Sequence, residues 1–178
     1  MRAILIMSPI EALEKMAAAE TVEISVFCAE LARLFRVREH EVAVYSLRQS
    51  MLRFILPAEL RRAGAIPVNS GSIVARTASS MKAECLNSFA TVRHSSVFET
   101  IKVGGNDMDP ASLIIQRMMT SPILDDANNL VGVIQISRKG ASLPSSGPEF
   151  TTEDLRQLEK AARIIGKMMP KLTEAAGV

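Results

Sequence analysis

Apolar residues in the C-terminal third of the chain change from an alternating pattern to a helical one. Residues 121–124 and 130–137 have the composition of two strands, joined by a turn of Asp, Ala and Asn at residues 125–129. Both faces of the second strand carry apolar side chains, so we expect it to be covered on both sides. A row of apolar residues then recurs at steps of three and four and predicts an amphipathic helix: Leu155, Leu158, Ala162, Ile165, Met169 and Leu172.

Single residues mark where these elements begin, end or approach a neighbour. Thr151 or Thr152, followed by acidic residues, is expected to cap the last helix. Pro170 is expected to kink or stop that helix, because proline lacks the N–H that a helix interior needs. Gly132 interrupts the second strand, where a missing side chain indicates a bulge or the close approach of another element.

The N-terminal part of the chain predicts helices followed by a hairpin. Ser8 and Pro9 are a helix start, and a second apolar stripe from Ile24 to Phe35 is either a separate helix or a continuation of the first. Residues 41–47 and 51–56 are rich in β-branched and aromatic residues and predict two paired strands. Arg53 lies either at a solvated edge or in a cavity as an anion anchor.

The pattern is weaker between residues 57 and 120. Ser70 or Ser72 can cap a short helix over residues 73–81. Residues 97–103 alternate roughly as a strand, and residues 104–107 predict a turn. Residues 113–123 fit a helix or a strand, and we favour a helical turn that leads into a strand.

Composition and charge narrow the class of protein. The chain has 178 residues, of which 48% are hydrophobic and 22% charged, which is enough for one domain with a sizeable core. Aromatic residues make up 4% and Met occurs ten times, so we expect an aliphatic, adaptable core. A net charge of +2, spread along the chain, predicts neither a nucleic-acid partner nor a membrane partner.

Candidate chemistry is sparse. The N-terminal apolar run, residues 3–7, is too short for a signal peptide or a membrane span, and two cysteines do not make a disulfide framework, so we expect a cytoplasmic protein. No metal-ligand spacing, phosphate loop or hydrolase motif is present, and His40 and His94 are the only histidines. Cys28 is expected to be a small buried hydrophobe. Cys85 with His94 remains open as a nucleophilic pair.

The strand VGVIQIS, the basic pair Arg138-Lys139, a polar loop and the helix start FTTEDLRQLEKAARIIG together resemble the C-terminal half of a GAF domain. The resemblance implies an α/β (α+β) fold with a central antiparallel sheet of five or six strands. It places the terminal helices on one face of the sheet, with short helices and loops on the other. The expected organisation is an N-terminal helix over residues 1–20, a GAF-like domain over residues 21–172 and a tail over residues 173–178.

The resemblance also suggests site residues. Against the NKFDE motif of cyclic-nucleotide-binding GAF domains, Lys139, Phe150 and Asp154 match, while Arg138 and Leu155 depart from it. This predicts a structural latch between Lys139 and Asp154, supported by Phe150, rather than cyclic nucleotide binding. A ligand pocket is expected on the sheet face opposite the terminal helices, bordered by Gly71. The RHSS segment and a nearby ring are its candidate ligand-binding residues, or else a polar surface loop: Arg93, His94, Ser95, Ser96 and Phe98.

The leading functional hypothesis is a non-catalytic sensory domain that binds an unidentified small molecule, without a cofactor, and acts as a homodimer on a separate effector protein. The last helix carries two adjoining apolar rows and the first helix adds another. These rows predict a dimer interface, unless the first helix lies across the last within one chain: Ile10, Leu13, Ala161, Ile164 and Met168. The alternatives are an interaction module whose pocket is filled by its own side chains, and a redox enzyme that depends on Cys85. The enzyme fits less well, because the GAF-type methionine sulfoxide reductases work through a set of pocket cysteines.

Overall fold

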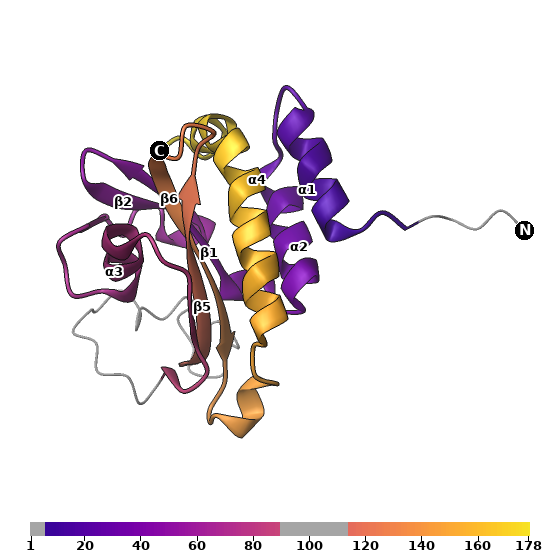
Figure 1. The fold of residues 1–178 in the computed structure, drawn as a ribbon, viewed down its shortest axis with the longest axis vertical. Helices are drawn as coiled ribbons and strands as arrows, with labels where there is room; N and C mark the ends of the chain where they lie inside the picture. The colour runs from indigo at the N-terminus through magenta and orange to yellow at the C-terminus, as the bar shows by residue number, and fades with distance from the viewer. Residues whose placement is uncertain (1–5, 90–113) are drawn as a thin grey trace, which may run out of the picture.

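Six antiparallel strands form the central sheet of this protein in a computed structural model that describes residues 6–89 and 114–178. Their order across the sheet is β3-β2-β1-β6-β5-β4. The two longest strands lie side by side near the middle, and the shorter strands flank them (Figure 1). The bounds are β1 (Val42–Arg48), β2 (Met51–Leu56), β3 (Ala65–Pro67), β4 (Glu84–Leu86), β5 (Ile115–Leu124) and β6 (Leu130–Lys139).

Helices cover the two faces of the sheet unequally. On one face, α2 (Ile24–Phe35) and α4 (Thr152–Ala176) pack against the sheet, and α1 (Pro9–Ala18) packs against these two helices. The short α3 (Ile73–Ser80) lies on the other face, against β5 and β6 (Figure 1). Single 3-10 turns occur at η1 (Glu39–Glu41), η2 (Ala58–Leu60) and η6 (Pro144–Ser146). This arrangement confirms the expected α+β fold class, with terminal helices on one face and a short helix on the other.

Local sequence explains most helix boundaries. Ser8 caps α1 through a capping box with Glu11, and Thr151 caps α4 through a box with Asp154. Between α1 and α2 the chain is not helical, so the two N-terminal stripes belong to separate helices. The residues of the predicted hairpin form β1 and β2, and residues 115–123 are strand rather than helix.

The apolar rows assigned to a dimer interface are buried within one chain. Helix α1 lies along α4 (Figure 1), and Leu13 from α1 is fully buried in the core that α2, α4 and the sheet share. Ala161 and Met168 are fully buried in the same core, Ile164 is 8% exposed, and Ile10 is half-buried against it. Leu13, Ala161, Ile164 and Met168 are therefore covered within one chain, where α1 supplies the cover that a second subunit was expected to provide. The prediction of a homodimer itself stays a prediction.

Helix α4 continues beyond Pro170 to Ala176, so of the two expected effects, a kink or a stop, the proline does not stop the helix. Met168, Met169 and Leu172 are buried on either side of the proline, and this packing holds the chain helical despite one missing hydrogen bond. The residues expected to form a tail are thus helical up to Ala176.

Two glycines lie where a neighbouring strand or helix approaches closely. A Cβ atom at Gly166 of α4 would overlap the carbonyl oxygen of Leu124 at the end of β5. A Cβ at Gly132 would overlap the carbonyl of Tyr45, which confirms the close approach expected there.

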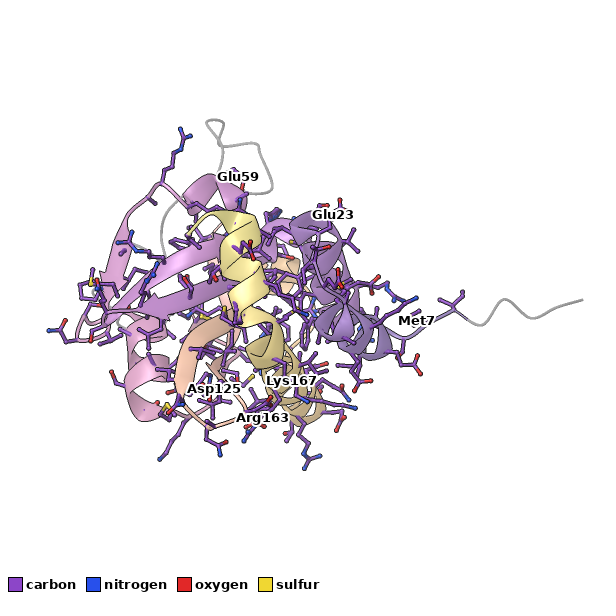
Figure 2. All side chains as sticks on the ribbon, turned by 90° about the horizontal axis from the view of Figure 1, so that it is seen from above. Met7, Glu23, Glu59, Asp125, Arg163 and Lys167 are labelled. Carbon is purple, nitrogen blue, oxygen red and sulfur yellow. The ribbon has the colours of Figure 1, made fainter. Side chains whose placement is uncertain are left out.

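Seen from above, the turn at Asp125 lies beside Arg163 and Lys167 of α4 (Figure 2), and Arg163 donates to Asn128 Oδ1 at 3.0 Å.

Candidate functional site

Four buried polar side chains gather on the sheet face that α3 covers. Tyr45 comes from β1, Thr77 from α3, Thr120 from β5 and Gln135 from β6. Each of the four is at most 5% exposed. We call this group the sheet-face cluster. It contrasts with the opposite face of the sheet, where the core against α1, α2 and α4 is built from apolar side chains.

Strand alternation places these residues on the same face. Gln135 pairs with Thr120 of β5 on one side and with Ala43 of β1 on the other. Its neighbours Ile134 and Ile136 point the other way and belong to the apolar core beneath the terminal helices. One strand therefore contributes both to the helix-side core and to the sheet-face cluster.

Hydrogen bonds connect the side chains of the sheet-face cluster, but one buried amide nitrogen takes no part in them. Tyr45 Oη donates to Gln135 Oε1 at 3.1 Å. Thr77 Oγ1 donates to the carbonyl of Ile73 at 2.9 Å, so in its 3.0 Å contact with Thr120 the hydroxyl of Thr120 is the donor. Gln135 Nε2 is buried and has no hydrogen-bond partner within the described part of the chain. A buried amide nitrogen without a partner is costly, which makes this atom the first candidate for a ligand contact.

Apolar residues surround the cluster on this face. Tyr45, together with Phe54, Val74 and Val133, belongs to one apolar cluster, while Ile73, Phe89 and Met118 form another. The side chains of the sheet-face cluster are uncharged. The cluster therefore offers an amide donor beside hydroxyl oxygens in an apolar frame, which suits an uncharged polar group of a small molecule.

The sequence-predicted ligand residues lie elsewhere or outside the described residues. Gly71 is exposed in the turn before α3, where Ser72 caps the helix by accepting from Ala75 N at 3.2 Å. Gly71 therefore borders α3 but is not part of the sheet-face cluster. The RHSS candidates fall outside the described residues: Arg93, His94, Ser95, Ser96 and Phe98.

The predicted latch between Lys139 and Asp154 is not formed. Lys139 Nζ donates to the carbonyl of His40 at 3.1 Å. Asp154 accepts from Thr151 N at 2.7 Å and lies 3.9 Å from Arg36. The reason is strand alternation: Arg138 shares the helix side of β6 with Ile134 and Ile136, so Lys139 points away from α4.

Arg138 rather than Lys139 connects β6 to the helix layer, at the end of α2 and not at Asp154 of α4. Its guanidinium donates to the carbonyls of Arg36 at 3.0 Å and Phe35 at 3.3 Å, at the C-terminal end of α2. It also lies 4.6 Å from the centre of the Phe150 ring, within the range of a cation–π contact. Phe150 is therefore buried beside β6, as the motif suggested, with Arg138 rather than Lys139 as its cationic neighbour.

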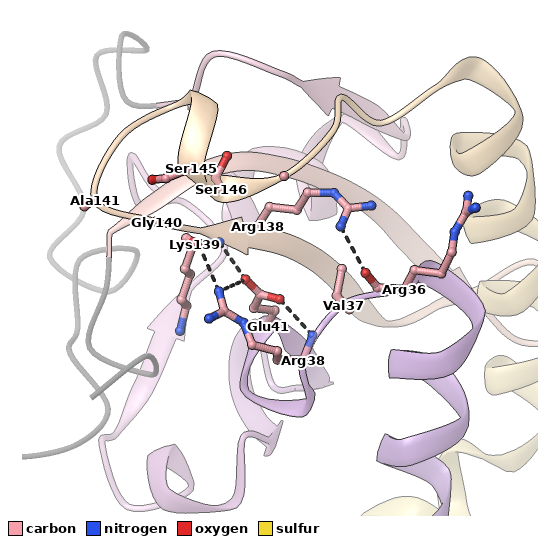
Figure 3. A pocket seen from close by; sticks show the side chains of 11 residues that line it. Arg36, Val37, Arg38, Glu41, Arg138, Lys139, Gly140, Ala141, Ser145 and Ser146 are labelled. Atoms are coloured by element: carbon pink, nitrogen blue, oxygen red, sulfur yellow. Dashed lines mark hydrogen bonds and ion pairs between the residues drawn. The ribbon is translucent and has the colours of Figure 1, made fainter. Parts of the chain in front are cut away.

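Glu41 organises the charged groups next to Arg138 (Figure 3). Its carboxylate accepts from Arg38 N at 2.8 Å, from Arg38 Nη2 at 2.7 Å and from Lys139 N at 2.7 Å. Burial alone raises the pKa of Glu41, but these hydrogen bonds and the charge of Arg38 outweigh it and hold the pKa below its ordinary value.

The two cysteines have raised pKa values. Burial, with added repulsion from Glu39 and Glu59, raises the pKa of Cys28 to about 11. Burial, then Asp154 and Glu149, raise the pKa of Cys85, whose Sγ lies 3.8 Å from the carbonyl of Phe150. Within residues 6–89 and 114–178, no three His, Cys, Asp or Glu side chains converge as a metal site would require. No helix of that part is long and apolar enough to span a membrane.

Sequence reasoning missed the sheet-face cluster, although one signal was present. Gln135 interrupts an otherwise apolar strand that was expected to be covered on both faces. A large polar side chain at such a position requires buried partners or a ligand. Thr77 and Thr120 gave no comparable signal, because threonine is ordinary in short helices and strands.

Comparisons with known proteins support the fold and no more. No family model matches the chain, and no curated protein matches it. Among solved structures, the GAF domain of a phosphoenolpyruvate-protein phosphotransferase from Coxiella burnetii is similar with a TM-score of 0.64 at 12% identity, covering 95% of this chain and 94% of that one. The GAF domain of the Acinetobacter phosphotransferase gives a TM-score of 0.62 at 11% identity, with 96% and 93% covered.

An enzyme shares the same fold. Free methionine-R-sulfoxide reductase from Neisseria meningitidis, solved in complex with its substrate, is similar with a TM-score of 0.58 at 14% identity, covering 93% of this chain and 89% of that chain. At such identities the likeness establishes architecture rather than activity. With its six-stranded antiparallel sheet, terminal helices on one face and α3 on the other, this chain has the fold of a GAF domain.

Proposed function

We propose that this protein is a non-catalytic sensory domain that binds a small, uncharged polar molecule at the sheet-face cluster. The observation that carries the proposal is the buried Gln135 amide nitrogen, which has no hydrogen-bond partner within the described residues. Thr120 and Tyr45 add hydroxyl oxygens next to it. Sensory and regulatory GAF domains share this fold. The shared fold supports a binding role for this protein but does not identify the ligand.

Strand β6 gives a physical route from the cluster to the terminal helices. Gln135 lies on the α3 face, while Ile134 and Ile136 on either side pack in the core with α4. Further along the same strand, Arg138 bonds the C-terminal end of α2. A ligand that moves Gln135 would therefore change the packing beneath α2 and α4. A separate effector protein could bind the surface of these two helices and respond to that change.

Cysteine chemistry is the weaker candidate. The raised pKa values of Cys28 and Cys85 keep both as thiols near neutral pH, whereas a catalytic cysteine works as a thiolate. Cys28 is buried and Cys85 half-buried, and both have acidic neighbours, which is the opposite of an activating environment. These features support a binding protein over a thiol-dependent enzyme.

The test is a thermal-shift screen of uncharged polar metabolites, such as amides, nucleosides and sugars, on three proteins. The wild type is compared with Gln135→Leu and with Gln157→Leu, a control on α4 that is far less buried. We expect at least one compound to raise the melting temperature of the wild type and of the control, but not that of Gln135→Leu. A compound that stabilises all three proteins equally would place the site elsewhere.

A further inference from the structure

A pocket of about 610 Å³ opens between the C-terminal end of α2, η1 and the end of β6, under the loop of residues 140–147 (Figure 3). None of the sheet-face cluster residues lines it. The described residues of its wall include four cationic side chains and one carboxylate: Arg36, Arg38, Arg138, Lys139 and Glu41. We call it the arginine pocket.

The Glu41 carboxylate of the wall already has hydrogen-bond partners within the protein. Both oxygens of Glu41 accept hydrogen bonds, from Arg38 and from the main-chain N–H of Lys139. The ion pair with Arg38, at 2.7 Å, uses the negative charge that the wall supplies. Glu41 therefore positions Arg38, and it forms its close ion pair with Arg38 rather than with Arg138.

Arg138 is a buried cation without a carboxylate partner among residues 6–89 and 114–178. It is 7% exposed, and no carboxylate of the described residues lies within 4.0 Å of it. Its guanidinium bonds two carbonyls at the end of α2, where the helix dipole supplies about half a negative charge. Its Nε is buried with no hydrogen-bond partner in the described part of the chain.

The direction of the pKa shift of Arg138 agrees with its burial. Burial lowers the pKa of Arg138, although Glu41 and Asp154 act to raise it. A guanidinium removed from water is destabilising unless a counter-charge is near. An anion in the adjacent pocket would supply that counter-charge.

We propose that the arginine pocket binds a small oxyanion, the phosphate or carboxylate group of a metabolite, between Arg36, Arg38 and Arg138. The side chains of Arg36 and Arg38 are 81% and 45% exposed, so their planar donors can reach a ligand from solvent. Ser145 and Ser146 also line the pocket, but their hydroxyls donate to loop carbonyls, so recognition of charge falls to the arginines. The volume is within the range of small-molecule sites, about 300–1,000 Å³.

Isothermal titration at low ionic strength tests the proposal with inorganic phosphate and, separately, with succinate. The wild type is expected to bind at least one of the two saturably at a single site. Arg36→Gln is the main variant, because its exposed side chain can be changed without harm to the fold. We expect it to weaken binding about tenfold, which is one charge-assisted contact. Arg62→Gln, an exposed arginine outside the pocket, is the matched control and should bind as the wild type does.

Which anion binds assigns the chemistry: phosphate indicates a phosphorylated metabolite, and succinate a carboxylate. Arg38→Gln, checked for folding by circular dichroism, should repeat the loss seen with Arg36→Gln. Gln135→Leu should leave anion affinity unchanged, which separates this site from the sheet-face cluster. Absence of binding of both anions to the wild type overturns the proposal, as does equal weakening by Arg36→Gln and Arg62→Gln, which would indicate a general charge effect.

Discussion

Glu41 is a buried carboxylate that makes the stability of the fold depend on pH. Its pKa lies below the ordinary value of 4.5 in the folded protein, so its contribution is complete above that pH and is lost as the pH falls through the lower folded pKa. We expect Glu41→Gln to lower the free energy of unfolding by about 2 kcal/mol at pH 7.

Urea unfolding of the wild type and Glu41→Gln between pH 7 and pH 3 measures this effect. The difference between the two proteins should be constant down to about pH 4.5 and shrink below it. Glu14→Gln is a suitable control, because Glu14 is exposed on α1. A difference that grows as the pH falls would contradict the assigned role of Glu41.

The reactivity of the two cysteines can also be predicted at the level of single residues. With a pKa of about 11, Cys28 is ionised to roughly one part in ten thousand at pH 7. Cys85 has its pKa raised by the same main cause, burial. We expect both thiols of the folded protein to react with a disulfide reagent far more slowly than those of the urea-unfolded chain. Rapid modification of Cys85 at neutral pH would favour the redox-enzyme alternative instead.

Lys139 and Arg138 show what could not be predicted from the sequence. The sequence motif led to Lys139 as the partner of Asp154, yet the structure assigns the helix side of β6 to Arg138. The two residues differ by one position, and strand alternation turns that one position into opposite faces. Motif matching names residue types, whereas the face on which each side chain lies depends on the register of the whole strand.

At the scale of elements, α4 depends on the absence of a side chain at Gly166. Its Cα approaches the carbonyl of Leu124, so a methyl group there would push α4 away from β5. We expect Gly166→Ala to lower the free energy of unfolding by about 1–3 kcal/mol, despite the better helix propensity of alanine. Lys167→Ala, next in sequence and exposed, is the control in the same denaturant melt. Equal stability of Gly166→Ala and the wild type would show that the close approach is not tight.

Elements with strong local signals could be predicted from the sequence. The capped starts of α1 and α4, the β1–β2 hairpin and the β5–β6 hairpin each rest on periodicity, turn residues or caps. The continuation of α4 through Pro170 could not, because burial of Met169 and Leu172 by other elements decides it. The sheet-face cluster as a whole could not be predicted either, since α3 and β1 contribute residues that lie far in sequence from the β5–β6 hairpin.

At the scale of the whole molecule, the terminal helices complete one core instead of presenting a surplus face. Met168 is fully buried and Ile164 nearly so, with α1 lying over α4. Replacing both by Glu would bury two unpaired carboxylates, at a cost of several kcal/mol each against a total stability of about 5–15 kcal/mol. We therefore expect the double variant to be unfolded.

Circular dichroism and size-exclusion chromatography of Ile164→Glu/Met168→Glu measure this outcome. A matched double variant on the exposed side of α4, Arg163→Glu/Lys167→Glu, should remain folded. A folded monomer from the Ile164/Met168 variant, together with a dimeric wild type, would restore these rows as a subunit interface.

The amide nitrogen of Gln135 is the proposed contact atom for the ligand. Side-chain amide signals in a ¹⁵N–¹H NMR spectrum report on that atom directly, and the signals missing from Gln135→Leu identify it. During titration with a compound selected in the thermal-shift screen, we predict that the Gln135 amide signals move saturably and with the dissociation constant of the whole protein. Signals of Gln135 that stay in place while others move would contradict the assignment of the sheet-face cluster as the ligand site.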